Sequence, residues 1–202
     1  EPDVIYEQLE DEEEFIPEET AEPESIEPEL VEELVVEADS YSYSNAIMPT
    51  EEEIRNCAYV IEPLRLMDVW KAITVDHMPG EGVVVAVIDT GVNYKNSDLA
   101  SSMWINPGEI PNNGIDDDKN GYVDDVHGIC VASDNPSQAQ GDPMDYASHG
   151  THCAGIIAMS AGDGGGVGVA YGSKIMAIKV GEGTFSLSAI CVGLRYAADN
   201  GA

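Results

Sequence analysis

The chain has 202 residues, of which 39 are acidic and only 8 are Lys or Arg, and its formal net charge is −31. A surface this acidic repels a phosphate backbone and argues against nucleic acid as a partner. No apolar run is long enough to span a membrane, and no basic segment followed by an apolar core marks a signal peptide. The sequence does not indicate an oligomeric state.

Acidic residues are concentrated in the first quarter of the chain. Residues 1–53 hold 21 Asp and Glu and no Lys or Arg, and repeated Glu-Pro steps disfavour a continuous helix. Such a segment repels itself and buries too little apolar surface to offset the entropy of ordering. We therefore predict that residues 1–50 form a disordered acidic leader or the end of a propeptide. Residues 51–202 have the length and composition of one domain.

Helical and strand patterns alternate along this domain. Residues 65–73 (RLMDVWKAI) predict a short amphipathic helix, and residues 82–91 (GVVVAVIDTG) predict a strand buried on both faces. A helix is predicted over 149–162, ending at a glycine, and a second strand over 174–180. A last helix is predicted over 186–202. Strand, helix, strand, helix is the order of an α/β fold with a parallel sheet flanked by helices.

Two polar residues stand where such a fold places functional groups. Asp89 comes at the carboxyl end of the first predicted strand, and His149 begins the helix that precedes the second. In open parallel sheets, ligands and catalytic groups gather just past the carboxyl ends of the strands. We therefore expect Asp89 and His149 to meet at one edge of the sheet.

Neither short motif around these residues identifies a function alone. The Asp-Thr-Gly at 89–91 also marks aspartic proteases, but those need two such aspartates and this chain has one copy. His149 and His152 could bind zinc with His127 as a third ligand. The pair lacks the Glu and the four-residue spacing of the H-E-x-x-H motif, however. A zinc hydrolase is therefore kept only as a third alternative.

Three longer blocks are much more specific in combination. They read GVVVAVIDTGV (82–92), SHGTHCAGIIA (148–158) and GVGVAYGSKIMAIKV (166–180). Together they resemble the subtilisin-like serine proteases, whose catalytic residues follow the chain order Asp, His, Ser. The resemblance extends over residues 60–202. It implies that residues 51–202 are the amino-terminal part of a subtilisin-like peptidase domain.

The resemblance implies roles for individual residues. Asp89 matches the aspartate of the catalytic triad, His149 matches the general base, and His152 matches a residue that supports the site. These roles fit the chemistry, because a serine hydroxyl attacks only when a histidine takes its proton and a carboxylate holds that histidine in one tautomer. The nucleophilic serine and the oxyanion-hole asparagine of the family fall beyond residue 202.

A segment after the second predicted strand resembles the part of the family that pairs with substrate. It reads VGEGTFSLS over residues 180–188. The resemblance places Gly181, Gly183 and Phe185 at the substrate cleft.

An acidic insertion, DDDKNGYVDD at 116–125, carries separate chemistry. Its side chains follow positions 1, 3, 5 and 9 of a calcium-binding loop, and a backbone carbonyl follows position 7. The predicted Ca²⁺ ligands are Asp116, Asp118, Asn120, the Tyr122 carbonyl and Asp124, with Asp125 as a possible substitute. The bidentate Glu of an EF-hand is absent, because His127 stands at position 12. A solvated acidic turn is the alternative.

The family resemblance adds two expectations about metals and location. Asp98 matches a position that often ligates calcium in the family. Family members act outside the cell, which implies a secreted or extracellular protein. The cysteines at 57, 130, 153 and 191 match no zinc or C-x-x-C spacing, so free thiols and disulfides both stay open.

The resulting hypothesis is a serine endopeptidase that acts on protein or peptide substrates. This chain holds its Asp and His and is predicted to be inactive by itself. The alternative is a non-catalytic fragment or pseudo-enzyme that acts as a calcium-dependent binding module.

Overall fold

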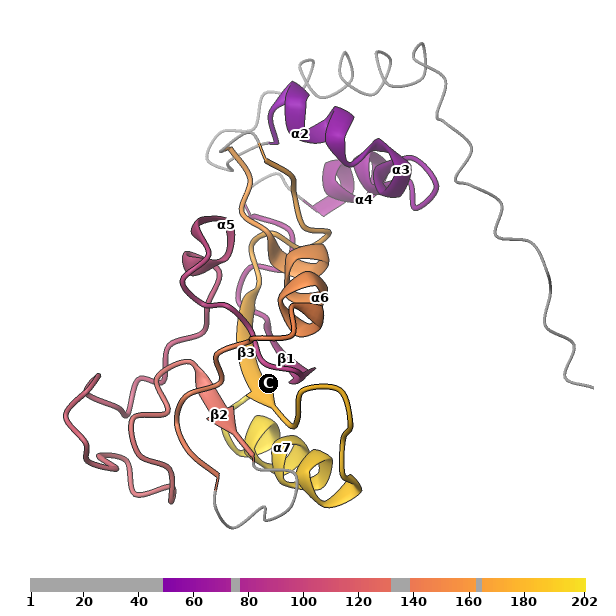
Figure 1. Ribbon diagram of the computed structural model, residues 1–202. Helices are drawn as coiled ribbons and strands as arrows, with labels where there is room; N and C mark the ends of the chain where they lie inside the picture. Colours follow the sequence, from indigo (N-terminus) through magenta and orange to yellow (C-terminus); the bar gives the residue numbers. More distant parts are fainter. Residues whose placement is uncertain (1–48, 74–76, 132–138, 163–164) are drawn as a thin grey trace, which may run out of the picture.

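The computed structural model describes residues 49–73, 77–131, 139–162 and 165–202 (Figure 1). The predicted leader lies outside these residues except for its last two positions. The elements are α2 (Glu51–Asn56), α3 (Ala58–Ile61), α4 (Leu66–Ile73), β1 (Val84–Asp89), α5 (Ser97–Ala100), β2 (Gly128–Cys130), α6 (His149–Ala158), β3 (Lys174–Lys179) and α7 (Leu187–Asp199).

Three parallel strands form the sheet, in the order β1-β3-β2. The pairing of β1 with β3 runs from Val84 opposite Lys174 to Asp89 opposite Lys179. On the other side of β3, Gly128 of β2 faces Ala177 so closely that a Cβ at Gly128 would lie 1.9 Å from the Ala177 oxygen. The predicted α/β fold with a parallel sheet is therefore confirmed, and the short strand β2 is an addition to it.

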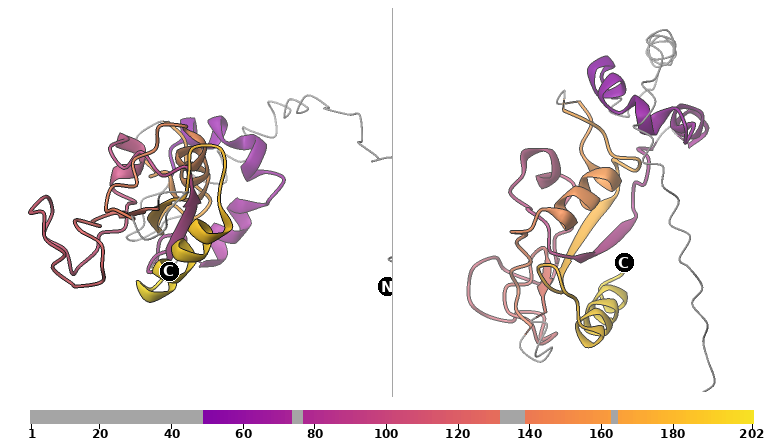
Figure 2. Two further views of the ribbon diagram at one scale, coloured as in Figure 1. Left: turned by 60° about the horizontal axis from the view of Figure 1, so that its bottom comes forward. Right: turned by 45° about the vertical axis from the view of Figure 1, so that its right-hand side comes forward.

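Helices cover both faces of this sheet (Figure 2). Successive side chains of a strand point to opposite faces. Ile175 and Ala177 of β3 accordingly belong to the cluster that includes α6, whereas Met176 and Ile178 belong to the cluster that includes α7. All four are 0% exposed. Burying each isoleucine stabilises the fold by about 1.5–3 kcal/mol.

The helices α2 to α4 pack as a third cluster beyond one end of the sheet (Figure 1). Trp70 lies at its centre and donates its indole hydrogen to the Val169 carbonyl, at 2.9 Å. The buried Glu53 closes a capping box with Thr50 and also accepts from the Gly162 amide, at 2.8 Å. These bonds attach the amino-terminal helices to the loop that follows α6.

All five elements predicted from the sequence are found, with one clear difference in length. The helix α6 ends at Ala158, not at Gly162, because Met159 turns to an extended conformation and its carbonyl accepts from the Gly168 amide. Ser186 caps α7, because its side chain accepts from the Ala189 amide. Within the described residues, no helix has the length and apolarity needed to cross a bilayer.

Candidate active site

Asp89 and His149 meet at the carboxyl end of β1, although 60 residues separate them in sequence. The His149 Nδ1 lies 2.8 Å from Asp89 Oδ1 and 2.9 Å from Oδ2. An ionised carboxylate only accepts hydrogen bonds, so Nδ1 carries the hydrogen. The Asp89 side chain is 15% exposed and the imidazole is 69% exposed. This arrangement holds one histidine tautomer and presents the other ring nitrogen to solvent.

Small residues allow the helix to approach the strand this closely. The Gly150 amide donates to Thr90 Oγ1 at 2.9 Å. A Cβ at Gly150 would lie 2.2 Å from the Gly91 oxygen and 3.0 Å from the Asp89 Cβ. A Cβ at Gly91 would in turn lie 2.2 Å from the Pro143 oxygen, and Gly91 has a φ of +98°. A side chain at Gly150 would therefore push the start of α6 away from Asp89, and one at Gly91 would displace the loop at residues 143–145.

Asp145 fixes the start of α6 from outside the helix. Ser148, with a left-handed φ of 72°, makes no capping hydrogen bond. Instead, Asp145 accepts from the amides of Ala147, Ser148 and Thr151 at 2.8–3.0 Å and from the Thr151 hydroxyl. Burial raises the pKa of Asp145, but these hydrogen bonds outweigh it and hold the pKa below its ordinary value. Asp145 lies four positions before His149, outside the motifs that the sequence shows.

Two other residues of the motif, His152 and Cys153, also lie on α6. His152 is exposed and lines an apolar cavity of about 440 Å³ together with Tyr59 and Val60, on the side of α2 and α3. The Cys153 Sγ lies 3.9 Å from His149 Nδ1. All four cysteines are free thiols in the structure.

The predicted substrate segment leaves the sheet beside Asp89, because Lys179 is the register partner of Asp89. A Cβ at Gly181 would lie 2.4 Å from the Thr184 oxygen, so the chain makes a tight turn there. Gly183 has a φ of +146°, and the half-exposed Phe185 packs over the turn. The structure thus brings Gly181, Gly183 and Phe185 to the same end of the sheet as the Asp89–His149 pair. Their contact with substrate stays a prediction.

The predicted calcium loop projects away from the sheet (Figures 1 and 2). Asp116 and Asp118 both turn toward its centre, and each accepts from the Asn120 amide, at 3.1 and 3.0 Å. The Asp124 carboxylate points elsewhere, because it accepts from the amides of Asn113 and Gly114, each at 3.0 Å. The side chain of Asp124 therefore organises a neighbouring turn.

A different carboxylate group forms around Asp118. Oxygens of Glu109, Asp118 and Asp125 lie within 4.8 Å of one another, and Asp125 is 0% exposed. Asp125 accepts from Asn120 Nδ2 at 2.9 Å and from the Tyr196 hydroxyl at 2.5 Å. Burial, followed by this bond to Asp125, raises the pKa of Tyr196. The ten-residue motif contained no signal for Glu109, since it lies seven positions before the motif begins.

Among the described residues, Asp98 does not join the group of Glu109, Asp118 and Asp125. Its carboxylate accepts from the Ser97 hydroxyl at 2.7 Å, and its carbonyl accepts from the Ser160 amide at 2.9 Å. The expectation that it ligates calcium stays a prediction.

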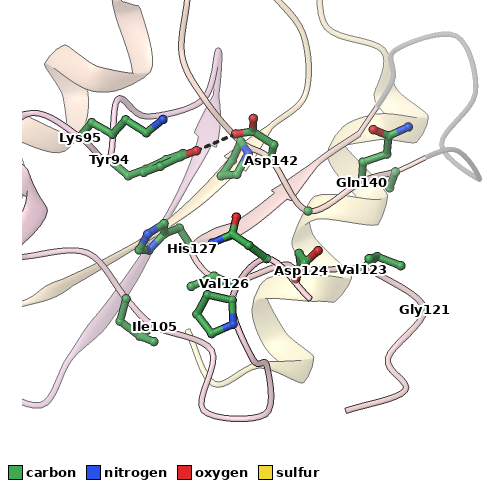
Figure 3. A pocket seen from close by; sticks show the side chains of 15 residues that line it. Tyr94, Lys95, Ile105, Gly121, Val123, Asp124, Val126, His127, Gln140 and Asp142 are labelled. Atoms are coloured by element: carbon green, nitrogen blue, oxygen red, sulfur yellow. Dashed lines mark hydrogen bonds between the residues drawn. The ribbon is translucent and has the colours of Figure 1, made fainter. Parts of the chain in front are cut away.

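His127 lies in a separate cleft of about 920 Å³ beside the acidic loop (Figure 3). Its ring stacks on Tyr94, with ring centroids 4.7 Å apart, and its Nδ1 lies 3.1 Å from the Trp104 carbonyl. The Tyr94 hydroxyl donates to Asp142 Oδ1 at 3.2 Å (Figure 3). Within the described residues, His127 joins no metal-binding group with His149 and His152. The three histidines proposed for a zinc hydrolase are therefore not brought together.

A family model described as the subtilase family matches residues 80–202. Subtilisin-like protease 1 of Plasmodium berghei is 35% identical over 130 residues, which cover 63% of this chain and 20% of that protein. The thermophilic serine proteinase of Bacillus sp. (strain AK1) is 34% identical over 124 residues, 60% of this chain and 24% of that protein. Kexin of Saccharomyces cerevisiae is 27% identical over 165 residues, which cover 80% of this chain and 17% of that protein.

The chain spans about a fifth of the length of these curated relatives. Among solved structures, that of MycP1 with its amino-terminal propeptide removed matches with 25% sequence identity and a TM-score of 0.43. The match covers 70% of this chain and 34% of that chain.

Proposed function

The chain belongs to the subtilase family, and on that premise we propose that it contributes the aspartate and histidine of the catalytic triad of a serine endopeptidase. The observation that carries the proposal is the pair of contacts, 2.8 and 2.9 Å, between His149 Nδ1 and the Asp89 carboxylate. A partly buried carboxylate that fixes an exposed imidazole is the geometry that a serine nucleophile needs beside it.

In this proposal each residue acts at a stated atom. The His149 Nε2 takes the proton from the serine hydroxyl as it attacks the peptide carbonyl, and later gives that proton to the leaving amine. Asp89 accepts the hydrogen on Nδ1, which keeps Nε2 free to act as the base and stabilises the imidazolium that forms. The Thr90 amide donates to Asp89 Oδ1 at 2.6 Å and so helps to hold the carboxylate in position.

We further propose that this chain alone does not hydrolyse peptides. Within the described residues, no serine hydroxyl bonds to His149, and the members of a triad act as a unit. The serine would come from the remainder of a longer protein. A non-catalytic binding module is the second candidate, but it gives no reason for the paired contacts of His149 with Asp89.

The test replaces His149 by Ala in the complete protein and measures peptide hydrolysis. We expect the loss of about 10⁴- to 10⁶-fold in kcat that removal of a triad member causes. His77→Ala is the matched control, because His77 is an exposed histidine paired only with Glu81 in the structure. Equal hydrolysis by the His149→Ala variant and the wild type would leave the binding module as the remaining candidate.

The substrate site extends from this pair along the segment after β3. We propose that Gly181, Gly183 and Phe185 contact the bound peptide. Two features support this role: the segment begins directly after the register partner of Asp89, and Phe185 is 43% exposed. An exposed aromatic ring at the same end of the sheet as Asp89 and His149 offers an apolar surface to a substrate side chain.

Calcium is proposed as a structural cofactor of the acidic loop. Residues 109–125 contain six carboxylates and one basic residue, Lys119. None of the ion pairs found among the described residues involves any of these carboxylates. Crowded, partly buried carboxylates repel one another unless a cation joins them. Asp118 belongs both to the ligand set predicted from the sequence and to the group with Glu109 and Asp125.

We also propose that the complete protein acts in the secretory pathway or outside the cell. Extracellular calcium modules bind with dissociation constants of about 10⁻⁴–10⁻³ M, so a loop of modest affinity fills where calcium is abundant. Detection of the processed protein in the culture medium tests this location. Free thiols are uncommon in oxidising compartments, so the redox state of the four cysteines is a second readout.

A further inference from the structure

Cys153 stands directly beside the Asp89–His149 pair. It follows His149 by four residues on α6, so both side chains lie on the same face of the helix, one turn apart. The Cys153 Sγ is 3.9 Å from His149 Nδ1, and atoms of Asp89, His149 and Cys153 all lie within 4.8 Å of one another. A carboxylate, an imidazole and a thiol are the three donor types that proteins use for zinc.

We propose that Asp89, His149 and Cys153 form a zinc-binding site that overlaps the catalytic pair and switches it off. The zinc ion takes one carboxylate oxygen, Nδ1 and Sγ as protein ligands, and water fills the fourth position. The exposure of the imidazole, 69%, leaves room for that water.

Two of the three distances between the ligand atoms are close to those of a tetrahedral zinc site, and the third, between Cys153 and Asp89, is at most 4.8 Å. With bonds of about 2.0–2.1 Å to nitrogen or oxygen and about 2.3 Å to sulfur, two ligands are separated by about 3.3–3.6 Å. The Nδ1–Sγ distance is 3.9 Å and the Nδ1–Oδ1 distance is 2.8 Å. The thiol must therefore move inward and the imidazole away from Asp89, each by roughly half an ångström. The exposed histidine side chain permits such a shift.

The donor set distinguishes this site from the acidic loop. A thiolate and an imidazole favour zinc over calcium and magnesium, which prefer oxygen. The carboxylates of Glu109, Asp118 and Asp125 offer oxygen atoms only. Burial raises the pKa of the Cys130 thiol, which disfavours the thiolate form that a metal binds.

Zinc binding would rearrange the protons of the pair in a defined way. The Cys153 thiol loses its proton to solvent, and the hydrogen on His149 Nδ1 moves to Nε2, because a neutral imidazole carries one hydrogen. Nε2 then holds a hydrogen and no longer takes one from a serine. Asp89 binds the metal instead of orienting the ring. This inhibition rests on the proposed peptidase function, whereas the metal site itself does not.

The experiment titrates the full 202-residue chain with Co²⁺, a spectroscopic substitute for zinc, and then displaces it with Zn²⁺. We expect a thiolate-to-cobalt charge-transfer band at one equivalent that zinc abolishes. Cys153→Ala should remove the band and weaken zinc binding by at least about tenfold, because losing a ligand costs no less than losing its supporting contacts. Cys191→Ala is the matched control, since Cys191 is an exposed thiol on α7.

A second variant separates the site from a general effect on folding. His149→Ala keeps the thiol but removes the nitrogen ligand, so it should also lose the tetrahedral cobalt spectrum, with an unchanged circular dichroism spectrum. Absence of the band in the wild type, or its persistence in Cys153→Ala, overturns the proposal. Because the readout is absorbance and not turnover, that result leaves the proposed peptidase function intact. Conversely, an inactive peptidase would not affect the cobalt spectrum.

Discussion

Lys179 is the register partner of Asp89 across β1 and β3, yet its ammonium group donates to the Met144 carbonyl at 3.0 Å and to Glu182 at 2.8 Å. The only basic side chain opposite Asp89 in the β1–β3 register is thus held by other partners, and the Asp89 carboxylate interacts with His149. This division of contacts leaves the negative charge of Asp89 to act on the imidazole.

Asp89→Asn in the complete protein should preserve the fold and lower kcat by about 10⁴-fold with little change in KM. An amide can donate to Nδ1, so the ring takes the tautomer with its hydrogen on Nε2, which cannot act as the base. Steady-state kinetics on a peptide substrate measure both constants. Asp68→Asn, at an exposed aspartate paired with Arg65, is the control. A KM effect without a kcat effect would contradict the role of Asp89.

The pairing of Asp89 with His149 could be predicted from the sequence, because the topology of the fold alone brings the two residues together. A strand that ends in Asp89 and a helix that begins at His149 meet at one edge of a parallel sheet, whatever the loops between them do. The support of the helix start was not predictable in the same way. Asp145 acts through three amides and a hydroxyl at once, and only the folded loop directs its carboxylate toward them.

For some residues, the extent of burial could not be predicted from the sequence either. His152 belongs to the same short motif as His149, but the turn of the helix points it away, and it is exposed in the structure. Glu109 is 8% exposed although it is a charged residue in a polar loop. Its carboxylate accepts from the amides of Asp117, Asp118 and Asp124, at 2.8–3.2 Å. Such contacts depend on the loop conformation, for which the spacing of the acidic residues gives no rule.

Gly150→Ala should destabilise the domain and separate His149 from Asp89. Its Cβ would lie 2.2 Å from the Gly91 oxygen, a backbone atom that cannot move without shifting β1. Overpacking of this kind costs about 1–3 kcal/mol. Gly155→Ala is the matched control in the same helix, because its Cβ would first meet the Met159 Cε at 3.5 Å. Ala at that position should be neutral or stabilising by up to about 1 kcal/mol. Equal unfolding free energies for the two variants in urea would argue against the close contact.

Asp145→Asn should destabilise the start of α6 most strongly at neutral pH. Both Asp145 oxygens accept hydrogen bonds, and the substitution replaces one of them by an NH2 group that cannot accept; hydrogen bonds to a charged group are worth about 1.5–3 kcal/mol. Hydrogen bonds hold the pKa of Asp145 below its ordinary value, which is about 3.9 in an unfolded chain. A depressed pKa in the folded state means that the stabilisation is complete above the unfolded value. It is then lost as the pH falls through the lower, folded value.

Urea unfolding of the wild type and Asp145→Asn at several pH values measures this difference. The gap in unfolding free energy should be widest near pH 7 and should narrow as the pH drops below about 4. Asp142→Asn is a nearby control, whose carboxylate accepts from the Tyr94 hydroxyl and the Met144 amide in place of the helix amides. If the difference in unfolding free energy instead widens as the pH falls, the ionised Asp145 carboxylate does not stabilise the start of α6.

Calcium should raise the melting temperature of the protein through the acidic loop, and Asp118→Ala should abolish most of that increase. A ligand that binds only the folded state stabilises it by about 2.7 kcal/mol at a hundredfold excess over its dissociation constant. Asp118 is the test residue because it is shared by both candidate ligand sets, the loop motif and the group with Glu109 and Asp125. Thermal melts with calcium and with a chelator give the increase for each variant.

Two further variants decide which ligand set holds the ion. Asp124→Asn removes a charge from the set predicted by the motif, but its carboxylate accepts from the Asn113 and Gly114 amides in the structure. Glu109→Gln removes a charge from the group that the structure assembles. If the structural group holds calcium, Glu109→Gln should weaken the calcium-dependent increase far more than Asp124→Asn, because each charged ligand lost from an oxygen site lowers its affinity. If Asp124→Asn instead weakens the increase more than Glu109→Gln does, the ligands predicted from the loop motif hold the ion. A calcium effect that survives in Asp118→Ala would exclude both sets and direct attention to Asp98, whose carboxylate accepts from the Ser97 hydroxyl.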